Sequence, residues 1–217
     1  YQQAREIGAR HSSSRHAGIT KEALASLWGI SLHTAAQTLR VTTQKGIKNS
    51  VHPVVRRFAT KQSRLRYNQL GSRHGRFYSD TFFASIPSTR GNTMAQLFVN
   101  DVKYLRIMPM KKKSDAGSAL LELLQDIGIP SALHTDGAKE LNQGKWKNVC
   151  EEFGIKQTLT EPYSPWQNRA EINIREAKKS VQRLMSRTNT PKALWDYCAC
   201  YVADLTCYTA NDIYVLH

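Results

Sequence analysis

The chain has 217 residues, enough for one sizeable hydrophobic core and a small appended module. It is strongly basic, with 31 Lys and Arg against 17 Asp and Glu. No apolar run approaches the ~18 residues of a membrane-spanning helix. Its four cysteines, at positions 150, 198, 200 and 207, are few and late in the chain. We therefore expect buried free thiols, and neither a membrane span nor a disulfide-stapled secreted scaffold.

The positive charge is concentrated in the first third of the chain. Residues 1–75 hold 13 basic and two acidic residues, which leaves 18 basic and 15 acidic residues for the remainder. A basic amino-terminal region ahead of a nearly balanced domain indicates a segment that contacts phosphates. The alternative is a solvated surface or one that binds acidic proteins.

The amino-terminal region divides by composition. Residues 1–18 are rich in Ser, Arg, Gln and His and predict a disordered basic segment. Residues 19–43 predict a small all-α, helix-turn-helix-like module, with helix caps at Thr20 and Ser31 and a stop at Gly29. The second helix offers three candidate DNA contacts, which are His33, Gln37 and Arg40. A plain helical hairpin used for packing or dimerisation fits the same pattern.

Residues 44–75 form a basic linker in this interpretation. The pair Arg56 and Arg57 are candidate DNA contacts, because basic residues near aromatic ones suit a segment that follows a nucleic-acid backbone. An exposed helix or strand leading into the next domain is the other interpretation.

From residue 76 the pattern predicts an α/β domain. Strands are expected at 77–86, 93–99, 104–110, 131–135 and 155–159, and helices at 114–127, 145–153, 168–187 and 191–210. The first three strands form an antiparallel meander, and strands and helices alternate after them. This order predicts a mixed sheet with flanking helices.

Three carboxylates stand out in this domain. Asp80 interrupts an apolar strand, where a bare carboxylate is costly to bury. Asp136 follows a strand in the motif His-Thr-Asp-Gly, and Glu171 opens a helix after a Pro-rich loop. Side chains at these places can converge on hard divalent cations, which carboxylates hold. A cap or turn role is the plain alternative for each acid, and Glu140 is a rival ligand.

The motifs at Phe77–Phe83, His134–Gly137 and Pro162–Glu171 resemble, in this order, the catalytic core of retroviral and LTR-retrotransposon integrases. Thirty-four residues separate Asp136 from Glu171, one fewer than is usual in that family, and Arg169 stands where the retrotransposon branch often has Gly. The resemblance covers about residues 76–210. It implies a ribonuclease H-like mixed five-stranded sheet and a catalytic core at 76–217 without the family's basic carboxy-terminal domain.

The resemblance also implies an activity. Asp80, Asp136 and Glu171 would be the catalytic residues and would hold two Mg2+ or Mn2+ ions for 3' end processing and strand transfer of element DNA. The implied partners are DNA, as element ends and target, and further copies of the chain, with a nuclear location and no membrane. No zinc is expected, because no cysteine precedes Cys150 to complete the family's His-His-Cys-Cys module.

Further DNA contacts are expected around the third acid. Arg175, Lys178 and Lys179 follow Glu171 on one helical face, and similar integrases use the first two of these offsets to bind DNA. The loop before the helix carries Tyr163, Gln167 and Asn168, which we expect over the substrate. Solvated surface charge is the alternative for the basic residues. At the level of function, a non-catalytic DNA-binding remnant and a cut-and-paste transposase or nuclease on the same fold are the alternatives.

Overall fold

The computed structural model describes residues 19–41, 75–138, 141, 143–160 and 169–209. The chain divides into two compact units. One unit contains the helices of residues 19–41, and the other comprises Arg66–Tyr208. Across the described residues, no helix has the length and apolar character needed to cross a membrane.

The small unit is a pair of helices whose ends are fixed by their caps. Its helices are α2 (Lys21–Trp28) and α3 (Leu32–Val41). The Thr20 hydroxyl accepts a hydrogen bond from the Ala23 N–H at 3.2 Å, and the Ser31 hydroxyl accepts one from the Thr34 N–H at 3.0 Å. Gly29 ends α2 with a φ of 67°, a left-handed conformation that glycine adopts without a steric penalty. Both expected helices and their caps are therefore confirmed.

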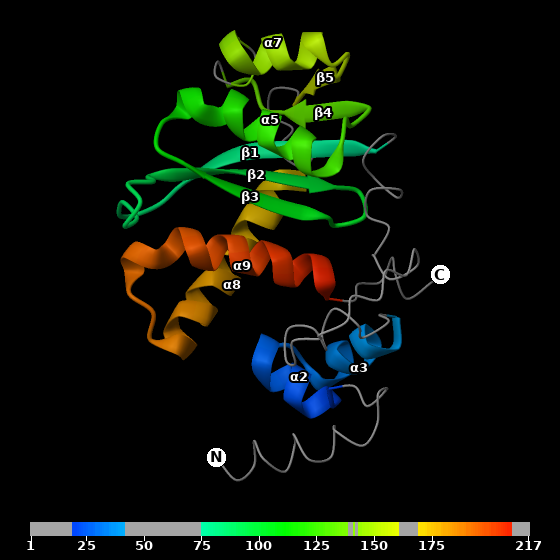
Figure 1. Ribbon diagram of the computed structural model, residues 1–217, viewed down its shortest axis with the longest axis vertical. Helices are drawn as coiled ribbons and strands as arrows, with labels where there is room; N and C mark the ends of the chain where they lie inside the picture. Colours follow the sequence, from blue (N-terminus) through cyan, green and yellow to red (C-terminus); the bar gives the residue numbers. More distant parts are fainter. Residues whose placement is uncertain (1–18, 42–74, 139–140, 142, 161–168, 210–217) are drawn as a thin grey trace, which may run out of the picture. The chain divides into compact units, whose positions relative to one another are not determined.

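The large unit is a five-stranded mixed sheet with helices on both faces (Figure 1). Its strands are β1 (Arg76–Phe83), β2 (Met94–Asn100), β3 (Leu105–Met110), β4 (Ala132–Thr135) and β5 (Lys156–Leu159). Its helices are α5 (Ala116–Ile127), α7 (Gly144–Glu152), α8 (Arg169–Thr188) and α9 (Trp195–Tyr208). The strand order is β3-β2-β1-β4-β5, with β1, β2 and β3 antiparallel and β4 and β5 parallel to β1. The expected ribonuclease H-like sheet with flanking helices is confirmed.

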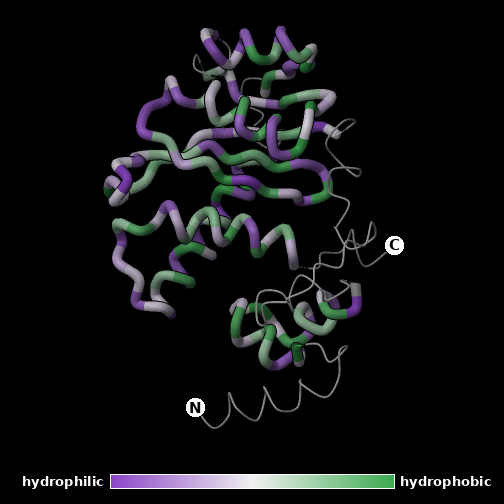
Figure 2. Tube along the Cα trace, in the orientation of Figure 1, coloured by the Kyte–Doolittle hydropathy of each residue, from purple (hydrophilic) through white to green (hydrophobic). Residues whose placement is uncertain are grey.

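Each face of the sheet has its own hydrophobic core. Phe77 and Phe98 belong to the core that α5 and α7 complete, and Tyr78, Phe82 and Leu97 belong to the core beneath α8 and α9. Figure 1 shows these two pairs of helices on opposite sides of the sheet, and Figure 2 shows hydrophobic stretches along the central strands. Because side chains alternate along β1, adjacent residues face different helix pairs. This alternation decides which side chains of β1 can meet α8.

Polar side chains on the α5 face of the sheet satisfy one another. Gln96 is fully buried; its amide donates to the Ser79 hydroxyl at 2.7 Å and accepts from the Thr81 hydroxyl at 2.6 Å. Ser79 donates in turn to the Leu97 carbonyl at 2.9 Å. Buried polar groups cost little when their hydrogen bonds are made. This cluster is therefore structural and explains why polar residues interrupt two central strands.

Two helices begin later than the sequence predicted. Helix α5 follows a 3-10 turn at Lys113–Asp115 instead of starting at residue 114. Here the Asp115 carboxylate accepts the Lys112 N–H at 3.0 Å and tightens the chain ahead of the helix. Helix α9 likewise follows a 3-10 turn at Lys192–Leu194 instead of starting at Pro191. Such turns are frequent at helix termini, where a sequence pattern does not separate them from α-helix.

Candidate active site

The sheet register places Asp80 beside Asp136. Strands β1 and β4 are parallel and pair Ser79 with Thr135, so the next residue on each strand is an acid at the same end of the sheet. Asp80 shares its face of β1 with Tyr78 and Phe82, which pack under α8. Both acids are partly exposed.

The third acid comes from the helix above this face. Glu171 lies in the first turn of α8, and Ala170 next to it is fully buried in the core that includes Tyr78 and Phe82. The Glu171 side chain itself is exposed. The fold therefore collects the three predicted acids at one end of the sheet, on its α8 face.

The electrostatics of Asp80 follow from this arrangement. The pKa of Asp80 is raised to about 6, mainly by burial and also by the nearby negative charges of Asp136 and Glu171, while the Thr81 N–H and Lys178 act to lower it. The Thr81 N–H donates to Asp80 Oδ1 at 2.7 Å. Mutual repulsion among the acids shows that they are close enough to interact. A carboxyl group with a raised pKa among other acids is characteristic of functional sites.

The chemistry of this donor set fits hard divalent cations such as Mg2+ or Mn2+, because all three groups are carboxylates. The ligand sphere itself is not assembled: among the described residues, no group of three His, Cys, Asp or Glu side chains is close enough together to hold an ion. Asp80 and Asp136 each bind their own backbone instead, and Asp136 Oδ1 accepts the Ala138 N–H at 3.3 Å. Rotation of these carboxylates toward one another would be needed to close the site.

The basic residues that follow Glu171 on α8 have different neighbours. Lys178 faces the acids: its Nζ lies 5.3 Å from the centre of the Phe82 ring, and its charge acts on Asp80. Arg175 and Lys179 instead approach Glu176 Oε1, with nitrogen–oxygen distances of 3.7 and 3.2 Å. Residues three apart on a helix are neighbours, so Glu176 draws Lys179 away from the acids.

Arg169 lies beside the candidate site, although the sequence pattern did not predict a role for it. Its Nη1 lies 3.0 Å from Asp101 Oδ1, and its guanidinium carbon lies 5.6 Å from the centre of the Tyr78 ring. Asp101 lies in the turn that follows β2. Arg169 thus ties the first turn of α8, which carries Glu171, to the turn after β2 and to β1.

Two aromatic rings underlie the acids. Tyr78 and His134 pack edge to face with ring centres 5.6 Å apart, and each lies two residues before an acid on the same face of its strand. The His134 ring nitrogens lie 2.9 and 3.2 Å from the hydroxyls of Thr158 and Thr160. Burial, together with the charge of Arg76, lowers the pKa of His134. The two-residue period of strands could have identified both rings from the sequence.

The remaining predicted site residues lie elsewhere. In the small unit, His33 and Arg40 are exposed and Gln37 is partly exposed, as a surface role requires. Their part in DNA binding stays a prediction. Six further candidates lie outside the described residues: Arg56, Arg57, Glu140, Tyr163, Gln167 and Asn168.

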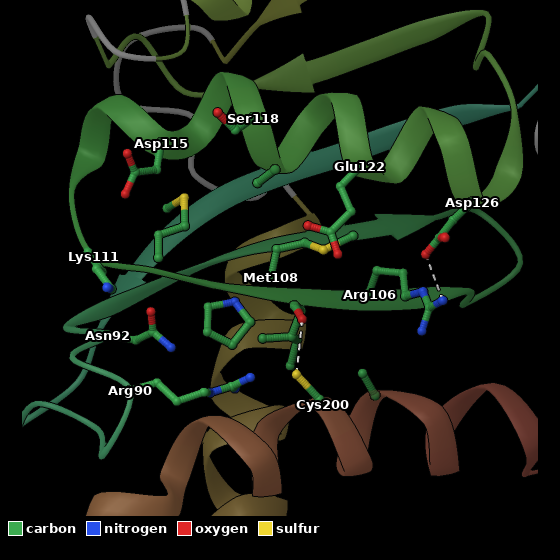
Figure 3. Close-up of a pocket in the computed structure, with 15 residues that line it drawn as sticks. Arg90, Asn92, Arg106, Met108, Lys111, Asp115, Ser118, Glu122, Asp126 and Cys200 are labelled. Carbon is green, nitrogen blue, oxygen red and sulfur yellow. Dashed lines mark hydrogen bonds and ion pairs between the residues drawn. The ribbon is translucent and has the colours of Figure 1, made fainter.

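A groove of about 650 Å³ lies elsewhere in the large unit, along the edge strand β3 and between α5 and α9 (Figure 3). Arg106 crosses one end of it, 2.8 Å from Asp126 and 3.0 Å from Asp204. The Cys200 thiol contacts the Ile107 carbonyl at 3.6 Å on its α9 side. None of the three predicted catalytic acids lines this groove, so it is separate from the candidate site.

No model of a known protein family matches the chain, and no curated protein matches it. Among solved structures, the chain is similar to the integrase catalytic core domain of HTLV-2, described as a trimeric form in complex with magnesium. The two share 14% sequence identity with a TM-score of 0.45, over 61% of this chain and 84% of the other.

Proposed function

We propose that this chain is the catalytic part of an LTR-retrotransposon integrase, a polynucleotidyl transferase that acts on DNA. The observation that carries the proposal is the meeting of Asp80, Asp136 and Glu171 at one end of the sheet, with the pKa of Asp80 raised to about 6. An ordinary fold stabilises buried carboxylates with hydrogen bonds and cations. Three acids gathered at one end of a sheet, with the pKa of one of them raised, are instead suited to binding a cation.

The proposed reaction has two phosphoryl transfers. In the first, a water oxygen bonds to phosphorus near the 3' end of the element, and the bond from phosphorus to the 3' oxygen of the preceding nucleotide breaks. That oxygen takes up a proton and leaves as a 3' hydroxyl. In the second, the freed 3' hydroxyl loses its proton and attacks a phosphorus of target DNA, and the 3' oxygen of the target strand leaves.

We assign the acids as ligands for two Mg2+ or Mn2+ ions, with Asp80 and Asp136 holding one and Asp80 and Glu171 the other. Bound divalent ions supply charge compensation for the entering and leaving oxygens. Asp80 must be ionised to serve both, so a cation has to overcome the burial and repulsion that raise its pKa. Arg169 holds the first turn of α8, and therefore Glu171, in place near β1.

Lys178 is the cation that the geometry supports best as a contact for the reacting phosphate, since it acts on Asp80 directly. Arg175 and Lys179 are exposed on the same helix and would bind neighbouring phosphates. The loop residues Tyr163, Gln167 and Asn168, the pair Arg56 and Arg57, and the α3 residues His33, Gln37 and Arg40 complete the proposed DNA contacts. Assembly into a homo-oligomer on paired DNA ends, and a nuclear location, belong to the same proposal.

The experiment is resolution of a labelled branched DNA in the presence of Mg2+ or Mn2+, which reverses strand transfer. It compares the parent with Glu171→Gln, which keeps the size of the side chain and removes its charge. The matched control is Glu176→Gln, the same change five residues later on an exposed part of α8. We expect activity in the parent and control and a loss of at least about 100-fold in Glu171→Gln, because a metal ligand is removed.

Inactivity of all three proteins, with salt-sensitive DNA binding retained, would contradict the catalytic proposal. The chain would then be a non-catalytic DNA-binding remnant. Activity that includes cleavage of both strands at the element ends would instead indicate a cut-and-paste transposase or nuclease on the same fold.

A further inference from the structure

The carboxy-terminal part of α8 forms a basic surface that extends beyond the phosphate contacts of the catalytic proposal. Residues 177–188 contain four Lys or Arg and no acid. A shallow hollow of about 580 Å³ on this part of the helix is lined by Lys179, Gln182, Arg183, Ser186 and Arg187, all of them exposed. We call these five residues the α8 stripe. Every one of them carries a hydrogen-bond donor, and three carry a positive charge.

The spacing of the three cations in the stripe is regular. Lys179, Arg183 and Arg187 follow one another at intervals of four residues, which is ~6 Å along a helix axis. Arg183 and Arg187 lie 12 and 16 residues beyond Glu171, or ~18 and ~24 Å along the helix. They also wind roughly 120 to 160° around α8 from Glu171, so the stripe is distinct from the surface that faces the acids.

One end of the stripe is already partly neutralised. Lys179 Nζ lies 3.2 Å from Glu176 Oε1, an exposed ion pair that a phosphate could replace at little cost. Arg183 and Arg187 lie one and two turns further from Glu176. The ion pair with Glu176 therefore involves the end of the stripe that is nearest to the catalytic acids.

The residue types that line the hollow indicate which kind of ligand it can bind. Protein partners bind mainly through buried aromatic and aliphatic anchors, and no apolar side chain lines this hollow. Phosphate oxygens are contacted by Arg, Lys, Ser and Gln, which are the residue types present. An extended row of cations with few apolar neighbours fits a polyanion whose charges are evenly spaced.

We propose that the α8 stripe binds backbone phosphates of the DNA that flanks the reacting phosphate. At 3.4 Å per base pair, Arg183 and Arg187 would contact phosphates roughly five to seven base pairs from the one that reacts. The placement of the reacting phosphate rests on the proposed function, whereas phosphate binding by the stripe does not require catalysis.

The test compares Arg183→Gln/Arg187→Gln with the control Lys147→Gln/Lys156→Gln. Both variants lose two exposed positive charges, but the control positions lie on α7, which covers the other face of the sheet, and on the edge strand β5. Binding to a labelled duplex is measured by anisotropy over a range of salt concentrations. The slope of log K against log salt is negative, and we expect its magnitude to be smaller by ~1.8 in the stripe variant. This change corresponds to roughly 30-fold weaker binding at 0.15 M salt. The slope of the control should change little.

A second arm of the test varies the length of the DNA. Branched DNA with arms of about 12 base pairs should show the defect of the stripe variant, and branched DNA with arms of about 4 base pairs should not, because it ends before the stripe. Thermal unfolding of each variant checks that it is folded. If the double variant does not fold, Arg183→Gln alone should still decrease the slope by ~0.9.

Three outcomes separate this inference from the proposed function. Equal salt slopes in the stripe variant and the control overturn the inference, even if the parent resolves branched DNA. An altered slope with an inactive parent supports the inference and contradicts the catalytic proposal. Unchanged DNA binding with lost binding of a labelled polyglutamate peptide overturns the inference and points to an acidic protein partner.

Discussion

Two carboxylates of the large unit, Asp196 and Asp80, have opposite surroundings. The Asp196 side chain is fully buried, and its oxygens accept hydrogen bonds from Arg90 and Asn92, both at 2.8 Å, and from the Tyr197 N–H at 2.9 Å. Burial alone would raise the pKa of Asp196, but the hydrogen bonds from Asn92, Arg90 and Ser88 outweigh it and lower the pKa.

The carboxylate of Asp80 receives fewer hydrogen bonds from the protein than that of Asp196. It accepts one N–H, from Thr81, and two of its neighbours are the acids Asp136 and Glu171, so its pKa rises where that of Asp196 falls. The contrast shows that this fold surrounds the fully buried Asp196 with donors, whereas it places the partly exposed Asp80 near other acids. A carboxylate left in this state stores unfavourable energy that a bound cation can relieve, which is expected of a functional site.

The largest expected effect on stability is that of replacing Asp196, the carboxylate whose hydrogen bonds are made. Asp196→Ala should lower the free energy of unfolding by about 2 to 4 kcal/mol, because it removes a buried charge and leaves Arg90 and Asn92 without their partner. The control on the same helix is Asp204→Ala, whose half-exposed ion pair with Arg106 should be worth less than about 1 kcal/mol. Urea denaturation measures the free energy of unfolding of both variants. Equal losses in the two variants would contradict the claim that Asp196 is the better-satisfied carboxylate.

Added metal should stabilise the folded chain through the under-satisfied acids. At about 100 times its dissociation constant, Mg2+ should raise the free energy of unfolding by about 2.7 kcal/mol, because it binds the folded state only. Glu171→Gln should lose most of this gain and Glu176→Gln should keep it. Thermal unfolding with and without Mg2+ measures the effect, and a gain that Glu171→Gln retains in full would argue against Glu171 as a ligand.

The pH dependence of stability should differ between Asp80 and its amide. The pKa of Asp80 is about 6 in the folded chain and near 3.8 when unfolded. Between these values the folded state binds more protons, so metal-free stability falls as pH rises from about 4 to about 6 and stays lower above that. Because Asp80 is partly exposed, we expect a fall of about 1 to 2 kcal/mol.

Asp80→Asn should remove this fall in stability with rising pH. At neutral pH without metal, the variant should be at least as stable as the parent. The measurement is urea denaturation of the parent and the variant at several pH values without divalent metal. The reverse trend, with the parent gaining stability relative to Asp80→Asn as pH rises, would contradict the proposed repulsion.

The smallest effect is expected at Arg169. Its ion pair with Asp101 is more than half exposed, so Arg169→Ala should cost less than about 1 kcal/mol of stability. The same change should raise the Mg2+ concentration at half-saturation several-fold, because the first turn of α8 is less well fixed. Arg169→Lys, which keeps the charge, should recover part of the loss. An unchanged metal titration in Arg169→Ala would limit this residue to a surface role.

The sequence predicted the fold well because its signals are local and periodic. Alternating residues in β1 and β2, the helical caps at Thr20 and Ser31, and the stop at Gly29 each fix an element without tertiary information. The start of α5 was missed because Asp115 forms a 3-10 turn that no periodicity distinguishes from α-helix.

The candidate site was predicted less completely. Asp80, Asp136 and Glu171 were singled out from motifs, and the parallel register of β1 and β4 explains how two of them meet. The pairing of Arg169 with Asp101 joins residues 68 positions apart, and a sequence alone does not contain that contact. The division of Arg175 and Lys179 from Lys178 depends on which neighbour each side chain reaches, which a helical wheel alone does not determine.

The most direct test of the central claim is Mn2+ binding followed by electron paramagnetic resonance of the free ion. The parent, Asp80→Asn, Asp136→Asn, Glu171→Gln and the exposed control Asp126→Asn are compared at equal protein concentration. We predict saturable binding in the parent and the control and its loss, by at least about tenfold in affinity, in each of the three acid variants. Equal Mn2+ binding in all five proteins would contradict a metal centre built from Asp80, Asp136 and Glu171.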